Sequence, residues 1–368
     1  MKSIGIITFH SSHNYGSVLQ AYAMVCTMRN LGLQVSVIDY RHPKTIAMYD
    51  FSWWSKNRGL KANLANLWYR AFLRRAIKRE QKFNTFIYKH LPLTKRYTDY
   101  KEIDDNFDYL VCGSDQIWNP KSSGKNSPAY FLDFGDNNST RFSYAASSGS
   151  QPFAKGQEEK YCRYLQKFKN IGVREHGMVT YIKEALGLRS IVNPDPTALI
   201  TMEDWQKIEE PVSDVPDKFI LVYSISNMVE TVIFAGKIGK EYNIPVLHIN
   251  PSRGSNYNMK KAGVISLNDI SPGQFLWLFH HAHFVISNSF HGNMFSIIYQ
   301  RPFAWYVTNE KDSRISTLHE RLGLKNTRQV KETKDITKEI WTMDYCKINT
   351  IVDNIRKQGI LYIMECIS

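Results

Sequence analysis

The sequence predicts an α/β protein with two Rossmann-like, doubly wound domains that face each other across a cleft. Three observations lead to this fold class. The chain has 368 residues, which is too long for one ordinary domain. Short apolar runs, typical of buried strands, alternate with segments of helical periodicity in two separate blocks. Between the blocks, residues 211–218 hold two Pro and two Asp, a composition typical of a linker.

The first block opens with a βαβ unit. Ile4–Phe9 is an apolar run, Ser17–Leu31 has apolar side chains at helical spacing, and Val35–Ile38 resumes as a strand. This order predicts parallel strands joined by a right-handed crossover. Further strands, each ending in a polar or small loop, are predicted at Tyr109–Cys112, Phe142–Ala146 and Ile171–Arg174.

The second block repeats this alternation. Strands are predicted at Phe219–Ser224, Val246–Ile249, Phe284–Ser287 and Phe303–Val307, with helices at Val229–Tyr242, Gln274–His281 and Met294–Tyr299. We therefore expect an N-terminal domain over residues 1–210, a linker over 211–218 and a C-terminal domain over 219–330. Residues 331–368 are expected to form a helical tail that can pack back on the first domain.

A basic amphipathic helix is predicted at residues 60–79, because apolar side chains recur there at helical spacing among many Lys and Arg residues. Two interpretations are open. The helix covers the core of the first domain, or it lies on an anionic membrane surface. The two interpretations differ in the surroundings that they predict for Trp68 and Phe72, which are either the protein core or the membrane surface.

Charge and cysteine content narrow the classes of function. The net charge of +13 favours anionic partners, namely phosphorylated substrates, anionic lipid or nucleic acid. The five cysteines include no CxxC pair and no Cys/His cluster at metal spacing, so we expect neither a disulfide scaffold nor a structural zinc site. No apolar stretch approaches the ~18 residues of a membrane span, and no signal-peptide cleavage site follows the N-terminus. We expect a cytoplasmic protein.

The loop from His10 to Gln20 is the first candidate for anion binding, because it lies between a strand and a helix. It contains Asn14, Tyr15 and Gly16, and Ser17 is predicted as the helix N-cap. Free amides at a helix start attract phosphate or carboxylate. A structural turn with an ordinary cap explains the same residues equally well.

The loop Ile286–Asn293 is the second candidate, and it places His291 near the start of a helix. A histidine in such a loop is well placed to give or take a proton. The alternative is a histidine that caps the helix or packs in the wall of the cleft. For His280, His281 and His283 we favour a packing role.

Two further strand ends carry polar side chains. Arg174 offers a fork suited to carboxylate or phosphate, although an ion pair with Glu175 or a neighbour at the sheet edge is the commoner fate of such an arginine. Asp115 and Gln116 suit sugar hydroxyls, or they stabilise a turn. The segment 193–197 contains two Pro and is interpreted as structural.

Taken in order, these segments resemble the polysaccharide pyruvyl transferase family from residue 1 to about residue 330. The matching segments are Gly5–Phe9, Asn14–Gly16, Leu19–Tyr22, Val37–Tyr40, Phe107–Asn119, Tyr130–Phe134, Ser143–Ser147, Val173–Glu175, Asp195–Thr197 and Ser287–Gly292. The occurrence of all these motifs in this order is what makes the resemblance specific to the family.

The resemblance implies a GT-B-like fold with the acceptor on the first domain and the donor on the second. It implies phosphoenolpyruvate as donor and co-substrate, with no cofactor and no metal. The product is a cyclic pyruvate ketal on a sugar of a cell-surface polysaccharide, such as a capsule or exopolysaccharide. Expected partners are phosphoenolpyruvate, a sugar acceptor with or without a lipid link, and an anionic membrane on its cytoplasmic, inner face. Nucleic acid is not expected.

The resemblance also assigns site residues. Many members have Arg-Leu-His in the second-domain loop, where Arg and His handle the donor. Here the triplet is Ser289-Phe290-His291, so the His carries over and the Arg does not. We assign acid/base catalysis to His291. The predicted donor-binding residues are Arg174, Asn288, Ser289, Gly292 and Arg314, with Arg174 as the first candidate for the missing Arg and Arg314 as the second. The predicted acceptor or cleft residues are Asn14, Tyr15, Gly16, Ser114, Asp115 and Gln116.

Two other functions compete with this one. A GT-B glycosyltransferase that uses a nucleotide sugar would have the same fold, so the fold does not separate the two. A nucleic-acid-binding or membrane-binding protein without enzymatic activity would fit the charge, but it leaves the loops at the strand ends unexplained.

Overall fold

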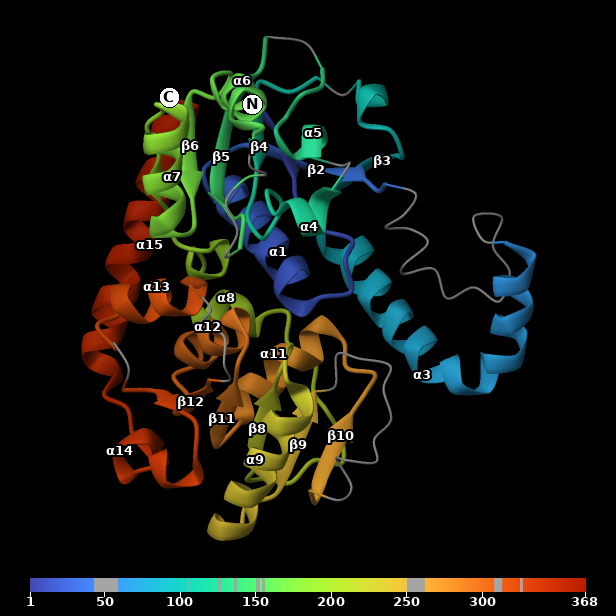
Figure 1. The fold of residues 1–368 in the computed structure, drawn as a ribbon, viewed down its shortest axis with the longest axis vertical. Coiled ribbons are helices and arrows are strands. Elements are labelled where there is room, and N and C mark those ends of the chain that lie inside the picture. The colour runs from blue at the N-terminus through green and yellow to red at the C-terminus, as the bar shows by residue number, and fades with distance from the viewer. Residues whose placement is uncertain are drawn as a thin grey trace. The chain divides into compact units, whose positions relative to one another are not determined.

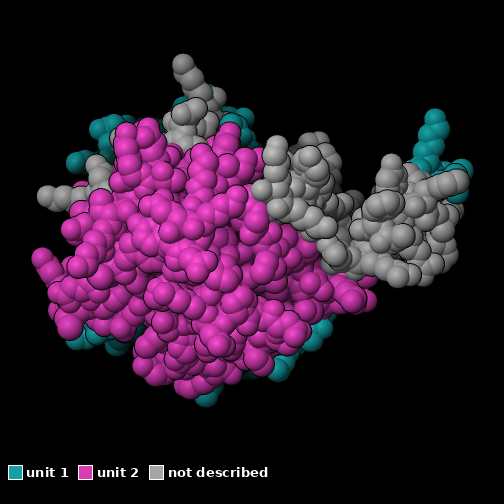
Figure 2. Space-filling model, turned by 90° about the horizontal axis from the view of Figure 1, so that it is seen from below, with its two compact units in different colours: residues 1–71, 84–200, 353–368 teal, residues 72–83, 201–352 magenta. Residues whose placement is uncertain are grey.

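The computed structural model describes residues 1–42, 59–104, 106–124, 127–135, 138–149, 153, 156–249, 262–307, 313–324 and 327–368. The chain forms two compact units, coloured separately in Figure 2. The first unit contains residues 1–71, 84–200 and 353–368, and the second contains residues 72–83 and 201–352.

A seven-stranded parallel sheet is the centre of the first unit (Figure 1). Its spatial order is β3-β2-β1-β4-β5-β6-β7. The strands are β1 (Ser3–Ile7), β2 (Gln34–Tyr40), β3 (Leu93–Tyr97), β4 (Tyr109–Cys112), β5 (Thr140–Ala146), β6 (Asn170–Val173) and β7 (Ile191–Val192). The helices in or entering this unit are α1 (Tyr15–Asn30), α3 (Leu60–His90), α4 (Pro120–Ser123), α5 (Ser127–Tyr130), α6 (Glu158–Leu165), α7 (His176–Leu186) and α15 (Tyr345–Ile367), with short 3-10 helices η1 (Tyr100–Glu102) and η3 (Pro196–Ala198).

Helix α1 begins earlier than predicted, and its N-cap is Asn14. The Asn14 side chain accepts hydrogen bonds from the amides of Gly16 (3.0 Å) and Ser17 (3.4 Å). The prediction of Ser17 as N-cap is wrong, because the Ser17 hydroxyl donates to the Asp115 carboxylate instead. The backbone amides at the start of this helix therefore find their hydrogen-bond acceptor in the loop that precedes the helix.

The C-terminal part of α15 belongs to the first unit. The Tyr362 hydroxyl donates to the Ser143 carbonyl at 2.9 Å, and the Tyr109 hydroxyl donates to the Ile367 carbonyl at 2.6 Å. Gly359 fits against Tyr144, so the helix approaches β5 closely. The end of the chain therefore covers part of the sheet formed by the N-terminal half.

Helix α3 includes the predicted residues 60–79 and continues to His90. Its C-terminal part is anchored by Phe83, Phe86 and Ile87, which are all buried. The side chains of residues 65–76, among them Trp68 and Phe72, lie outside the described part of the structure. No helix in the described ranges has the length and apolar character needed to cross a bilayer.

The second unit is built on a six-stranded parallel sheet in the order β10-β9-β8-β11-β12-β13 (Figure 1). The strands are β8 (Ile220–Tyr223), β9 (Val246–Ile249), β10 (Val264–Leu267), β11 (Phe284–Ser287), β12 (Phe303–Tyr306) and β13 (Gln329–Val330). The helices are α8 (Met202–Gln206), α9 (Met228–Tyr242), α11 (Pro272–His281), α12 (Phe290–Ile298), α13 (Ser313–Arg321) and α14 (Lys338–Trp341), with the 3-10 helix η4 (Thr333–Asp335). The predicted fold class, two doubly wound α/β domains, is confirmed.

Both sheets have a topological switch point. In the first sheet the chain proceeds outward from β1 in one direction and from β4 in the other, and in the second sheet β8 and β11 have this relation. Ligands in open α/β sheets bind beyond the carboxyl ends of the strands at such points. The loops after β1, β4, β8 and β11 are therefore the places to look for a site.

Candidate functional site

At the switch point of the first sheet, the loops after β1 and β4 are joined by a buried polar network. Ser17 donates to Asp115, and the Gln20 amide nitrogen donates to Thr8 Oγ1 at 2.8 Å. The Gln20 oxygen accepts from the Ser114 amide at 3.2 Å. The structure thus brings together two loops that the sequence predicted to line the acceptor side.

The remaining predicted residues of these loops differ in exposure. Asn14 is exposed, whereas Tyr15 and Gly16 are buried beneath it. Gln116 is half-buried, and its side-chain oxygen accepts from Asn119 at 2.6 Å. Among the predicted acceptor residues, Asn14 and Gln116 therefore present the most accessible polar groups, and the others shape the loop.

Arg174 is buried and paired with carboxylates. Its Nη1 donates to Asp195 Oδ2 at 2.8 Å, and its Nε lies 3.5 Å from Glu175 Oε1. Burial alone would lower the pKa of Arg174, but the charges of Asp195, Glu175 and Asp115 outweigh it and raise the pKa above its ordinary value. The arrangement matches the ion-pair alternative for this residue, and it disfavours direct contact between Arg174 and a substrate anion.

Asp195 is the residue of this network that the sequence interpretation undervalued. Segment 193–197 is predicted to be structural, and within it Asp195 accepts from Arg174, from Ser114 Oγ at 3.1 Å and from Thr197 Oγ1 at 2.8 Å. It follows β7 just as the other polar loops follow their strands. Its position after a strand is the sequence signal for a polar contact at this edge of the sheet.

A second polar cluster lies at the ends of β1 and β2. His10 Nε2 is 3.0 Å from Asp39 Oδ1, and Arg41 and Arg96 also contact the Asp39 carboxylate. Burial acts to raise the pKa of Asp39, but hydrogen bonds and charges from His10 and Arg41 outweigh it and lower the pKa to about 2. Asp39 is not among the predicted site residues, although an acidic residue at a strand end is a recognisable signal.

The Asp39 cluster predicts a pH dependence of stability. Because the folded-state pKa is depressed, ionised Asp39 stabilises the fold above its unfolded pKa of about 4. This contribution is lost as the pH falls from about 4 through about 2, and it amounts to about 2 kcal/mol. We expect Asp39→Asn to lower the free energy of unfolding at pH 7 by about that amount, with the difference from wild type shrinking toward pH 3. Exposed Asp217→Asn is the control, and an equal loss at pH 7 and pH 3 would contradict the assignment.

In the second unit, Asn288 follows β11 at the switch point and holds the loop that follows β8. Its Oδ1 accepts from the Ile225 amide at 3.0 Å, and its amide nitrogen donates to the Ser226 carbonyl. The side chain is thus occupied in joining the two loops. This favours a role in shaping the site over direct donor contact for Asn288.

His291 lies in the first turn of α12, and it is 7% exposed. The prediction that it sits near a helix N-terminus is confirmed, although the helix begins at Phe290 and not at Met294. The N-cap residue Ser289 makes no side-chain capping bond, so no such bond competes with a ligand for the first amides. An imidazole and the first backbone amides of a helix therefore occupy one turn.

Gly292 lets this turn approach the sheet. A Cβ at this position would lie 2.0 Å from Ser287 Oγ and 3.2 Å from Tyr223 Cδ1. Ser287 Oγ in turn donates to the Tyr223 carbonyl at 2.6 Å and accepts from the Ser289 amide at 3.1 Å. The glycine predicted as a donor-binding residue is therefore required by packing against Ser287 and Tyr223.

Helix α13, which contains the other predicted arginine, packs against α12. His319 Nε2 donates to Asn293 Oδ1 at 3.0 Å, which ties α13 to α12. Ile315 belongs to one buried cluster with Phe290, the residue before His291. Arg314 precedes Ile315 and is half-buried. The packing therefore puts Arg314 on the segment of α13 that adjoins the start of α12.

Comparison with known proteins agrees with this description. The family model for polysaccharide pyruvyl transferase matches residues 14–310. A search of curated protein sequences gives no match.

Among solved structures, a glycosyltransferase from Rickettsia africae has a TM-score of 0.55 at 11% identity, covering 99% of this chain and 97% of that chain. The UDP-GlcNAc 2-epimerase from Neisseria meningitidis, bound to UDP-GlcNAc, has a TM-score of 0.52 at 10% identity, covering 100% and 99% of the two chains. At such low identity these structures establish a shared GT-B-like fold and nothing about substrates.

Proposed function

Because the chain belongs to the polysaccharide pyruvyl transferase family, we propose that it transfers the enolpyruvyl group of phosphoenolpyruvate to sugar hydroxyls and closes a cyclic ketal. The observation that carries the proposal is the turn after β11, where His291 and uncapped helix amides meet at a topological switch point. The donor is an anion with a carboxylate and a phosphate, and both groups suit helix amides and an arginine.

The reaction requires one well-placed acid. The methylene carbon of phosphoenolpyruvate takes a proton, and an oxocarbenium-like centre develops at the neighbouring carbon. One sugar hydroxyl adds there, phosphate leaves, and a second hydroxyl closes the ring. Of the two hydroxyl protons, one balances the new methyl group and the other leaves with phosphate. We assign proton delivery to His291.

The missing family arginine is best replaced by Arg314. Arg174 is paired with Asp195 and Glu175, whereas Arg314 lies on α13, whose Ile315 packs in one cluster with Phe290, the residue before His291. We propose that Arg314 pairs with the donor carboxylate or phosphate, together with the amides of the α12 first turn. Arg174 then acts as a positioning residue for the loops after β4 and β6.

Ligand-dependent thermal unfolding tests the donor. Phosphoenolpyruvate at 100 times its dissociation constant should stabilise the protein by about 2.7 kcal/mol. Arg314→Ala should reduce this stabilisation, and exposed Arg189→Ala should not. Stabilisation by a UDP-sugar and none by phosphoenolpyruvate would favour the nucleotide-sugar glycosyltransferase. Mass spectrometry of candidate acceptors, for the gain of one pyruvate with loss of water, tests transfer itself.

We also propose that the basic segment 60–79 brings the enzyme to an anionic membrane, where a lipid-linked acceptor would lie. The support is compositional, because the side chains of residues 65–76 lie outside the described part. Each Lys or Arg at an anionic surface contributes about 1 kcal/mol. Co-sedimentation with anionic vesicles at low salt, lost in Arg74→Glu/Arg75→Glu, would support docking. Equal absence from anionic and neutral vesicle pellets would refute it.

A further inference from the structure

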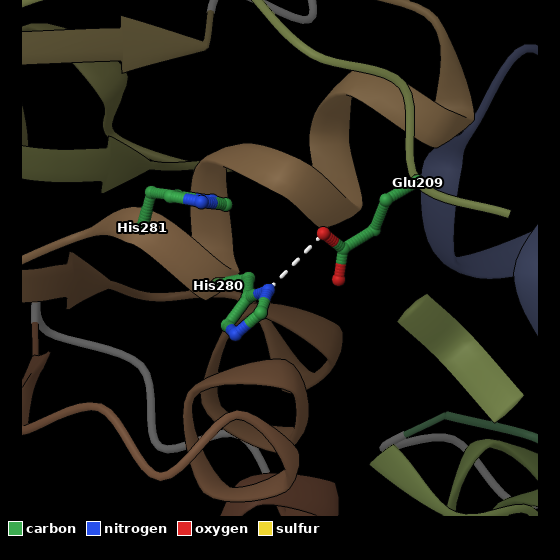
Figure 3. A group of neighbouring side chains, drawn as sticks. All are labelled: Glu209, His280 and His281. Carbon is green, nitrogen blue, oxygen red and sulfur yellow. Dashed lines mark hydrogen bonds and ion pairs between the residues drawn. The ribbon is translucent and has the colours of Figure 1, made fainter. Parts of the chain in front are cut away.

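A carboxylate and two imidazoles meet at the C-terminal end of α11, within the second unit (Figure 3). Glu209, His280 and His281 each offer a ligand atom, and these three atoms lie within 4.8 Å of one another. We propose that this cluster binds Zn²⁺. Imidazole nitrogen and carboxylate oxygen are common zinc ligands, whereas Mg²⁺ and Ca²⁺ prefer all-oxygen sites.

The Glu209–His280 pair already has a suitable separation. His280 Nδ1 lies 3.1 Å from Glu209 Oε2, shown by the dashed line in Figure 3. Two ligands of a tetrahedral zinc ion with bonds of about 2.0–2.1 Å lie about 3.3 Å apart. The ion would therefore replace the shared proton with little movement of either side chain. The Tyr299 hydroxyl also interacts with the Glu209 carboxylate.

Neighbouring groups orient both rings. His281 Nδ1 donates to the Trp277 carbonyl at 2.9 Å, so the neutral ring carries its lone pair on Nε2. The same ring stacks on Trp277, with centroids 4.1 Å apart. His280 stacks on Tyr299 at 5.1 Å, and its Nε2 is 3.3 Å from the Gln206 side-chain amide. The contact of His281 with a carbonyl is typical of histidines that bind a metal, because the ring nitrogen that does not bind the ion donates to an acceptor.

The charges around the cluster favour the binding of a cation, with moderate affinity. The C-terminal end of a helix carries partial negative charge, and the Glu209 carboxylate adds to it. Arg301 opposes the ion, since its positive charge interacts with Glu209. With three protein ligands, the remaining coordination falls to water. We therefore expect weaker binding than in a closed four-ligand structural site.

The position of the cluster separates it from the candidate active site. Tyr299, against which His280 stacks, is the C-cap of α12, whereas His291 lies in the first turn of that helix. Glu209 follows α8, and the adjacent Glu210 accepts from Ser271, the N-cap of α11. The segment that contains Glu209 and Glu210 is thus already bonded to the N-terminal end of α11. An ion bound to Glu209 and His280 would fix the C-terminal end of α11 to the same segment. We expect it to stabilise the second unit and not to take part in transfer.

The sequence alone did not indicate this site. Glu209 and His280 are 71 residues apart, so no ligand spacing is visible. His280 and His281 were interpreted as packing residues, which remains accurate for their stacking contacts. Only the folded chain brings the carboxylate to them.

Zinc titration of tag-free, chelator-treated protein tests the proposal. Calorimetry should give one Zn²⁺ per chain, and Zn²⁺ should raise the melting temperature while Mg²⁺ should not. His281→Ala and Glu209→Gln should each weaken zinc binding by more than about tenfold and remove the thermal shift. Because His281 is exposed and Glu209→Gln is conservative, both variants should fold, which circular dichroism checks.

His176→Ala is the matched control, since it removes an exposed histidine from the first unit and should leave zinc binding unchanged. The proposal fails if wild-type protein binds no zinc. It also fails if His281→Ala and Glu209→Gln keep the stoichiometry and the thermal shift of wild type. Neither outcome bears on phosphoenolpyruvate binding, so the two proposals are tested independently.

Discussion

Replacing His291 with Gln should leave the fold intact and lower kcat for pyruvyl transfer by about 10²–10⁴-fold, the usual contribution of a positioned acid or base. His291 is 7% exposed in the first turn of α12, and glutamine fills a similar volume there without a titratable proton. The dissociation constant for phosphoenolpyruvate should change little, because the helix amides and Arg314 supply the anion contacts in our proposal.

Exposed His283→Gln provides the control in the same unit. Single-turnover kinetics with a saturating donor separate the chemical step from binding. A kcat in His291→Gln within a factor of two or three of wild type would remove His291 from the acid/base role. In that case proton delivery would fall to another group.

Replacing Arg174 with Ala should destabilise the first unit by about 3–5 kcal/mol, as expected when one partner of a buried ion pair is removed. Asp195, which accepts from Arg174 at 2.8 Å, would keep its charge in a buried environment. Urea unfolding, followed through a spectroscopic signal from the first unit, measures the loss. Arg189→Ala, which removes an exposed charge, should change stability by no more than about 0.5 kcal/mol.

Kinetics distinguish this structural role from direct donor binding. If Arg174 gripped the donor, Arg174→Ala would raise the KM for phosphoenolpyruvate while stability stayed near wild type. Arg174→Lys adds a second test, because lysine keeps the charge but lacks the fork that reaches both Asp195 and Glu175. We expect Arg174→Lys to be destabilised by less than Arg174→Ala.

Strand positions could be read from the sequence because parallel strands buried on both faces are short apolar runs. Val246–Ile249 and Phe284–Ser287 were predicted with the bounds that the structure gives. The edge strand β3 was not predicted, because Leu93–Tyr97 carries Thr, Lys and Arg and resembles a loop. Helix starts were less predictable, since a cap depends on a side-chain hydrogen bond. Ser17 was predicted as the cap, but its hydroxyl donates to Asp115, 98 residues away, and Asn14 caps the helix instead.

The candidate site was predictable as a set of loops and not as a set of contacts. Strand-end position placed His291 and the Gly113–Gln116 loop correctly. The sequence offered Glu175 as a partner of Arg174, but it did not indicate the contact of Arg174 with Asp195, 21 residues away, or that of Asn288 with Ile225, 63 residues away. The hydrogen-bond partners of such buried polar side chains depend on which distant segment the fold brings next to them.

The membership of residues 353–368 in the first unit bears on the order in which the protein folds during synthesis. Domains generally fold from the N-terminus as the ribosome releases them. Here the first sheet lacks Tyr362 and Ile363, both buried within its unit, until residues 353–368 have emerged from the ribosome. The second sheet, formed by residues 220–330, is complete before then. We therefore expect the second unit to reach its native packing first, and the first unit to stay partly uncovered until residues 353–368 have been made.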